Sequence, residues 1–274
     1  MALIPRENGA LNINPATSLD DAIAVAGSDW LYAVTAIYLV AFICILVPCF
    51  TSPESDRIFH YQNTLTVLIG GIVYYAEASD LGWSAVGTHQ VFFVRYVNWL
   101  VAFPSIALGL GMLSNLSWTT IFTNIVSALV WVVTYIAATY TSTSYKWGFY
   151  AFGTFTYVIL AMSTINESRG SAQKIDMARD YMILAGWANA IWLLYPIAFA
   201  LTDGAHVLHG DGAAIFIGIL DILIMPIWSI LFIFLSHKWD YQRLRLAFSD
   251  HRFDPTNKHL LEGKSSAITD VSSA

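Results

Sequence analysis

The chain has 274 residues, of which 57% are hydrophobic, 15% aromatic and 12% charged, and its mean hydropathy is +0.58. Soluble domains carry about 25% charged residues, so this composition excludes an ordinary soluble protein and indicates a membrane protein. The formal net charge of -6 is spread over tails and loops, and no basic block of the kind that binds nucleic acid is present.

Apolar segments of spanning length, about 20 residues each, follow one another along the chain. They are expected at residues 30–50, 59–78, 91–113, 117–139, 146–163, 181–201 and 213–236. Polar residues such as Gln62 and Asn63 dilute the second segment, and a run of Gly and Thr dilutes the fifth. The short connectors are typical of neighbouring antiparallel helices. The sequence therefore predicts an all-α membrane protein with a seven-transmembrane-helix bundle.

The basic residues set the expected orientation. If the N-terminus lies outside, most of the 13 Lys and Arg residues fall on the cytoplasmic side, namely Arg57, Arg169, Lys174, Arg179, Lys238, Arg243, Arg245, Arg252, Lys258 and Lys264. The positive-inside rule favours this arrangement. We expect an extracellular tail at 1–28, a membrane domain at 29–237 and a cytoplasmic tail at 238–274, with the last helix continuing into residues 238–252.

Two charged residues lie well inside the predicted spans, Arg95 in the third and Asp221 in the seventh. A charge within a membrane helix is costly unless it is paired or reaches a water-filled cavity. Both residues fall in the outer half of their helices, so we expect them to face each other directly or through water. The pair either fixes helix register or belongs to an ion pathway. Glu77 and Asp80, at the outer end of the second span, are expected to be solvated at the interface.

One face of the sixth segment carries aromatic residues around a helix-kinking proline. Trp192, Tyr195, Pro196 and Phe199 stand at i, i+3, i+4 and i+7. Such a stripe alone is more often core packing. Further residues from two other segments fall at comparable depth, namely Trp99, Pro104, Phe149 and Tyr150. Together they predict an aromatic-walled cavity between helices, where bundles hold small ligands.

Acidic residues and histidines cluster in the loop before the seventh segment, at Asp203, His206, His209 and Asp211. Histidine and aspartate ligate transition metals, but no ordered scaffold for the ligands is evident from the sequence. We therefore predict a solvated loop and no metal site. The sequence contains no hydrolase, kinase or nucleotide-binding constellation, so we do not expect an enzyme.

Several motifs resemble those of the microbial (type I) rhodopsins. They are RYVNWLVAFP at 95–104, WLLYP at 192–196 and ILD at 219–221, followed one helical turn later by Met225. GSDWLYAV at 27–34 and YKWGFYAFG at 145–153 are similar to the fungal branch of that family. The resemblance covers about residues 27–237. It implies a bundle in which all-trans retinal lies between the tryptophans of helices three and six, bound as a Schiff base to a lysine four residues after the helix-seven aspartate.

Carried over to this chain, the resemblance implies a retinal pocket and a counterion shell. The pocket positions are Trp99, Pro104, Phe149, Tyr150, Trp192, Tyr195, Pro196, Phe199 and Met225. The counterion shell is Arg95, Asn98, Asp221 and, by a looser alignment, Tyr75.

Several positions depart from the family pattern. Asn98 replaces the proton-accepting aspartate, Gly109 replaces the proton donor, and Met225 occupies the lysine position. A thioether cannot condense with an aldehyde, so covalent retinal is excluded, while non-covalent retinal stays open. An amide and a glycine cannot titrate, which argues against proton pumping.

The resemblance implies the lysine-less branch of fungal opsin-related proteins. Its heat-shock-type relatives are plasma-membrane proteins that restrain the proton-pumping ATPase. We therefore expect a non-photochemical, stress-linked regulator or partner of plasma-membrane proteins such as the proton ATPase. The chain would sit in the lipid bilayer without nucleic acid, and a homo-oligomer stays open. The alternative is a sensor or passive ion path that binds retinal or another small apolar ligand non-covalently. A light-driven ion pump ranks last, because it also requires the amine.

Overall fold

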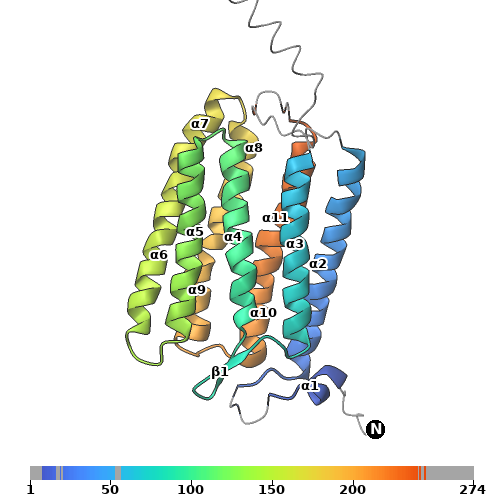
Figure 1. The fold of residues 1–274 in the computed structure, drawn as a ribbon, viewed down its shortest axis with the longest axis vertical. Helices are drawn as coiled ribbons and strands as arrows, with labels where there is room; N and C mark the ends of the chain where they lie inside the picture. The colour runs from blue at the N-terminus through green and yellow to red at the C-terminus, as the bar shows by residue number, and fades with distance from the viewer. Residues whose placement is uncertain are drawn as a thin grey trace, which may run out of the picture.

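The computed structural model describes residues 8–16, 19, 21–52, 57–239, 241 and 244. Within them, seven helical passes form one bundle (Figure 1). The first four passes are α2 (Val25–Thr51), α3 (Arg57–Ala78), α4 (Phe93–Leu113) and α5 (Trp118–Thr139). The fifth joins α6 (Lys146–Met162), the π-helical turn η2 (Ser163–Glu167) and α7 (Ser168–Lys174). The sixth joins α8 (Ala178–Trp192), α9 (Leu194–Phe199) and η3 (Ala200–Gly204), and the seventh joins α10 (Gly210–Ile222), η4 (Leu223–Ile227) and α11 (Trp228–Ser236).

The bundle has the surface of a membrane protein. Six of the seven passes are long and apolar enough to cross a membrane. The remaining pass, α3, is more polar, as the dilution of the second segment by Gln62 and Asn63 predicted. Helices satisfy their own backbone hydrogen bonds, which hydrocarbon demands. Large apolar side chains cover the outside of the bundle, including Val40, Ile72, Phe122, Phe152 and Phe155, each at least 60% exposed. The predicted seven-helix fold is confirmed, and the chain is a multi-pass membrane protein.

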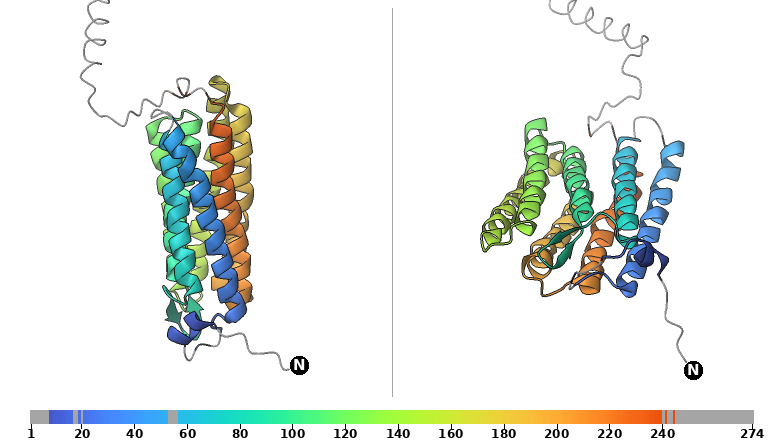
Figure 2. Two further views of the ribbon diagram at one scale, coloured as in Figure 1. Left: turned by 90° about the vertical axis from the view of Figure 1, so that its right-hand side faces the viewer. Right: turned by 60° about the horizontal axis from the view of Figure 1, so that its bottom comes forward.

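Successive helices pack side by side, and the ring closes where α10 meets α2. Between α3 and α4 the chain forms an antiparallel hairpin of β1 (Ser84–Val86) and β2 (His89–Val91). Its two-residue turn needs a positive φ, which Gly87 supplies at 65°. The hairpin lies at the same end of the bundle as the short helix α1 (Gly9–Ile13) and the start of α2 (Figure 2). We call this the hairpin end.

The N-terminal segment, where we expected an extracellular tail at residues 1–28, packs on the end of the bundle. Its described part is bonded to the bundle: Asn8 Nδ2 donates to Ser28 Oγ at 2.8 Å, and Asn14 Nδ2 donates to the Ser79 carbonyl at 2.9 Å. Helix α2 already begins at Val25. The sequence analysis did not predict these contacts, because polar side chains that bond to helix ends produce no hydrophobic periodicity in the sequence.

At the other terminus, α11 ends at Ser236, and Trp239 lies outside the helix. The expected continuation of the last helix therefore does not occur at 238–239. Most of residues 240–252 lie outside the described part of the chain.

Helices α2 and α3 approach closely at a glycine. The buried ring of Tyr38 stacks on Tyr74 with centroids 5.2 Å apart, and a Cβ built on Gly70 would lie 2.2 Å from Tyr38 Cε1. A Cβ on Gly71 would lie 3.5 Å from Tyr38 Cβ, an ordinary contact. Of these two glycines, Gly70 is therefore the one that leaves room for the Tyr38 ring.

We expect Gly70→Ala to destabilise the bundle by about 1–3 kcal/mol, because the added methyl group overpacks against Tyr38. Gly71→Ala is the matched control, since it has the same intrinsic helix gain without the clash. The measurement is the free energy of unfolding in mixed detergent micelles. Equal stabilities for the two variants would contradict the packing described here.

Candidate functional site

Asp221 is the centre of a buried polar network on the seventh pass. It lies near the end of α10, and its side chain is fully buried. The carboxylate accepts hydrogen bonds from Tyr195 Oη at 2.5 Å, Tyr74 Oη at 2.6 Å and Trp99 Nε1 at 3.0 Å. Asn98 Nδ2 adds a longer contact at 3.4 Å. The donors come from α3, α4 and α9, so the carboxylate links four passes.

All of the described residues that bond this carboxylate are neutral. Hydrogen bonds to an ionised carboxylate are roughly twice as strong as bonds between neutral groups. The O–H and N–H dipoles that point at the carboxylate therefore offset the free-energy cost of burying it, without a cation in contact with it.

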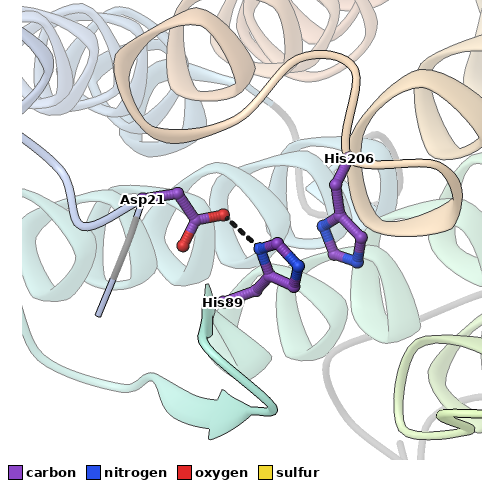
Figure 3. Close-up of side chains that lie close together, drawn as sticks. All are labelled: Asp21, His89 and His206. Carbon is purple, nitrogen blue, oxygen red and sulfur yellow. Dashed lines mark hydrogen bonds and ion pairs between the residues drawn. The ribbon is translucent and has the colours of Figure 1, made fainter. Parts of the chain in front are cut away.

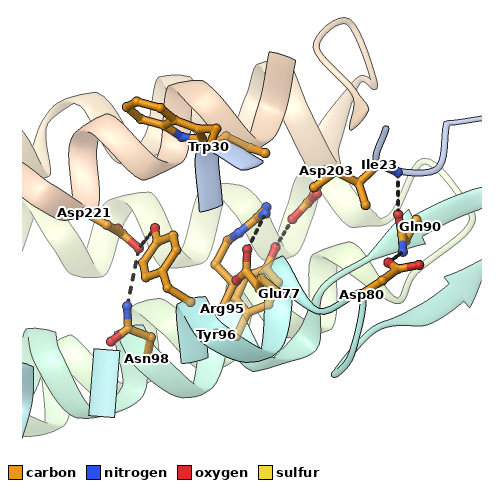
Figure 4. A network of polar contacts seen from close by, with 12 residues as sticks. Ile23, Trp30, Glu77, Asp80, Gln90, Arg95, Tyr96, Asn98, Asp203 and Asp221 are labelled. Carbon is orange, nitrogen blue, oxygen red and sulfur yellow. Dashed lines mark hydrogen bonds and ion pairs between the residues drawn. The ribbon is translucent and has the colours of Figure 1, made fainter. Parts of the chain in front are cut away.

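Arg95 has a different partner from the one that the sequence predicted. Its Nη2 lies 3.2 Å from Glu77 Oε2, and both side chains are buried (Figure 4). Of the two arrangements predicted for Arg95 and Asp221, direct or through water, the direct one is wrong. The prediction that Glu77 is solvated at the interface is also wrong, because its side chain is buried. Glu77 was missed because it stands at the end of a diluted span, where an acid is usually hydrated. The buried ion pair joins α3 to α4.

Met225 lies one helical turn beyond Asp221 and is fully buried. Tyr38 Oη lies within hydrogen-bond distance of both residues, 3.0 Å from Met225 Sδ and 3.2 Å from the Asp221 carbonyl oxygen. Met225 falls in the π-helical turn η4, next to Pro226. Proline removes one backbone donor and distorts the helix, which accounts for the local irregularity at Pro226.

Aromatic rings fill the middle of the bundle by packing on Phe103. Its ring centroid lies 4.9 Å from Tyr195, 5.0 Å from Trp131, 5.8 Å from Trp192 and 6.0 Å from Trp99. A flat polyene between two rings needs about 7 Å of separation, two aromatic thicknesses. Phe103 is therefore too close to each of these four rings for a polyene to lie between it and any of them.

A family model described as bacteriorhodopsin-like protein matches residues 26–239. The chain belongs to the bacteriorhodopsin-like family. Among its relatives are Opsin-like protein carO of Fusarium fujikuroi, 30% identical over 90% of this chain and 87% of the relative, and Protein YRO2 of Saccharomyces cerevisiae, 32% identical over 89% and 76%. The 30 kDa heat shock protein of the same yeast is 28% identical over 89% of this chain and 83% of its own length.

Solved structures of this bacteriorhodopsin-like family share the fold. The light-driven proton pump of Coccomyxa subellipsoidea has a TM-score of 0.76 with 19% identity, and covers 78% of this chain and 98% of its own. The pump from Leptosphaeria maculans has a TM-score of 0.75 with 23% identity, and covers 82% and 98%. The resemblance to microbial rhodopsins that the motifs indicated is thereby confirmed.

Most pocket positions predicted from the rhodopsin resemblance converge in the bundle. Buried residues among them are Trp99, Trp192, Tyr195, Pro196, Phe199 and Met225, whereas Pro104 and Tyr150 are half-buried. Tyr150 stacks on Phe199 with centroids 5.7 Å apart. Phe149 is 39% exposed and faces away, so its assignment to the pocket is wrong. Adjacent helical residues point about 100° apart, and Tyr150 is the one that turns inward.

The assignment of Tyr75 to the counterion shell is also wrong by one residue. Tyr75 is 58% exposed and makes an edge contact with Tyr32, whereas Tyr74 bonds Asp221. The helix-two motif was too loose to fix the register. Sequence reasoning also missed Tyr38, because a tyrosine in an apolar helix gives no sign of its inward face.

The hairpin end is more ordered than the predicted solvated loop. Asp203 accepts a short hydrogen bond from Tyr96 Oη, and Asp211 Oδ1 accepts the Ala24 N–H at 2.8 Å. Asp80, which was also expected to be solvated, is 2% exposed and accepts from Gln90 Nε2 at 2.5 Å. Figure 4 shows the contacts of Asp203 with Tyr96 and of Asp80 with Gln90, and Asp221 farther along the bundle.

Proposed function

We propose that this chain is an opsin-related membrane protein that carries no Schiff-base retinal and acts as a non-photochemical, stress-linked partner of plasma-membrane proteins such as the proton ATPase. In this proposal the N-terminus and the hairpin end face outward, and the membrane is that of a fungal cell. The observation that carries it is the environment of Met225.

The residues present do not fit covalent retinal. At the position where the rhodopsin resemblance expects the lysine, Met225 offers only a thioether sulfur, which accepts a contact from Tyr38. No amine is available there for condensation with an aldehyde. The Asp221 carboxylate, which would balance a charged Schiff base, is already bonded by neutral donors.

The space between the bracketing tryptophans also argues against the ligand. Phe103 contacts Trp99 and Trp192 at once, with centroids 6.0 and 5.8 Å away. A polyene beside these tryptophans would have to share this space with the Phe103 ring. The packing of Phe103 on both tryptophans therefore supports a filled core rather than a ligand cavity.

Proton transfer along the family's route lacks its titratable groups. Asn98 and Gly109 hold the positions of acceptor and donor, and neither can exchange a proton near neutral pH. A Cβ on Gly109 would lie 3.0 Å from Gln62 Nε2, so the Gln62 amide occupies the neighbouring space.

The names of the relatives support a role in stress, since one of them is a 30 kDa heat shock protein. The test is co-purification of the tagged full chain from native membranes in mild detergent, with an unrelated seven-helix membrane protein carrying the same tag as control. We expect reproducible recovery of the proton ATPase and faster proton extrusion after deletion of the gene. The absence of a reproducible partner, together with unchanged proton extrusion, would overturn the partner role.

The closed core leads to a prediction about restoring the chromophore. We expect Met225→Lys alone to remain colourless with all-trans retinal, because the Phe103 ring packs against both Trp99 and Trp192 and restricts the room for the ligand. The double variant Met225→Lys/Phe103→Ala is expected to gain a visible absorption band. Met225→Lys/Phe152→Ala is the matched control, since Phe152 is 68% exposed on the outside of the bundle. A visible band in the single lysine variant would show that the Phe103 packing does not close the pocket.

A further inference from the structure

Three potential metal ligands meet at the hairpin end, outside the Asp221 network. Asp21 precedes α2, His89 begins β2, and His206 lies in the loop before α10. One ligand atom from each lies within 4.8 Å of the other two. Figure 3 shows the two imidazole rings face to face and the Asp21 carboxylate at the edge of His89. Of these three residues, only His206 belongs to the loop cluster identified in the sequence. Asp21 and His89 come close to it only through the fold.

The arrangement of the carboxylate is typical of a prepared ligand. Asp21 Oδ2 lies 2.9 Å from His89 Nδ1, and its Oδ1 accepts the Gln90 N–H at 2.9 Å. Only 7% of the Asp21 side chain is exposed. Ligating carboxylates are usually held by such a second hydrogen bond, which here comes from the backbone of β2.

The histidines are placed by two separate elements. Their rings are nearly parallel, at 7°, with centroids 3.7 Å apart. Aromatic rings generally prefer offset or edge-to-face contacts over this geometry. The backbone thus brings two imidazoles together without an evident gain from the ring contact itself.

We propose that Asp21, His89 and His206 bind a divalent transition-metal ion of the zinc type at the hairpin end of the bundle. Two imidazoles and one carboxylate form a common ligand set for such ions, and water completes the tetrahedron. The ion would join the N-terminal segment, the hairpin and the loop before α10.

Binding requires a contraction of the cluster and a turn of the imidazole rings out of their parallel stack, because an ion lies in the plane of each ring that ligates it. With metal–ligand bonds of about 2.0–2.2 Å, tetrahedral ligand atoms lie about 3.3 Å apart. Separations of up to 4.8 Å must therefore close by at most roughly 1.5 Å. Rotation of His89, whose side chain is 35% exposed, supplies this movement.

The hollow beside the cluster offers room for an ion. Asp21 and His206 line this hollow at the hairpin end, together with Asp203 and His209.

The experiment uses the full chain in detergent, carrying a tag without histidines and stripped of metal with a chelator. Zn²⁺ is titrated by calorimetry, and Co²⁺ is added separately to report coordination by its visible bands. We expect one tight site per chain and a higher thermal midpoint with Zn²⁺, because the ion binds only the folded state. His89→Asn and His206→Asn should each weaken binding at least about 10- to 100-fold, whereas the control His209→Asn should bind as the wild type does.

A second measurement on the unmodified protein guards against variants that fail to fold. With Cu²⁺ bound, pulsed electron paramagnetic resonance should detect two coordinated imidazoles. The proposal is overturned if the wild type binds no Zn²⁺ at about 100 μM, if His209→Asn loses as much affinity as His206→Asn, or if fewer than two imidazoles are detected.

Discussion

Glu77→Ala is expected to lower the free energy of unfolding by about 3–5 kcal/mol, because it leaves the Arg95 guanidinium buried without its partner. Both side chains are nearly inaccessible, at 5% for Arg95 and 1% for Glu77. Removing either partner alone should therefore be costly. Unfolding of each variant in mixed detergent micelles measures the loss.

The double variant Glu77→Leu/Arg95→Met should recover much of that loss, since apolar residues of similar size can replace a buried pair at little cost. A double-mutant cycle with alanine at both positions should show strong coupling. The matching cycle between Arg95 and Asp221 should show much weaker coupling, because these side chains do not bond each other. Stronger coupling of Arg95 to Asp221 than to Glu77 would contradict the pairing described above.

Asp221→Ala is expected to destabilise the bundle by about 3 kcal/mol or more, for a reason independent of Arg95. It removes the acceptor of two buried tyrosine hydroxyls and one indole N–H. Each buried donor left without an acceptor costs about 1–3 kcal/mol. The same unfolding assay measures the loss.

Asp221→Asn serves as the graded control for this position. Its amide keeps one oxygen acceptor, and tyrosine hydroxyls can rotate to accept from the new N–H groups. We therefore expect a smaller loss than for alanine. Tyr74→Phe and Tyr195→Phe should each destabilise the wild type but have little effect in the Asp221→Ala background. Full additivity of these changes would argue against the shared network.

The fold could be predicted from the sequence because each membrane-spanning helix requires a run of about 20 apolar residues, which is easily recognised. Seven apolar segments appear at the predicted places, and most boundaries agree within a few residues, as for Trp118–Thr139 against the predicted 117–139. Backbone hydrogen bonding within hydrocarbon permits little else. The motifs around Trp99 and Trp192 likewise placed the two bracketing helices correctly.

The side-chain partners were less accessible to sequence reasoning. Tyr74 and Tyr75 differ by one position, and only the rotation of α3 decides which of them faces Asp221. Glu77 stands at a helix end, where hydration is the usual outcome, yet the fold covers it. Contacts between distant segments, such as those of Asp21 with His89, have no local signature because they depend on how the loops fold together.

We propose that the position of the family's photochemical site is, in this chain, a structural core around Asp221 and Met225 that holds no Schiff-base retinal. The most direct test is the absorption spectrum of the wild-type protein, purified from cells of its native host that were supplied with all-trans retinal. We predict no visible band and no retinal in the extracted protein. A visible band that hydroxylamine bleaches in the wild-type protein would contradict the claim.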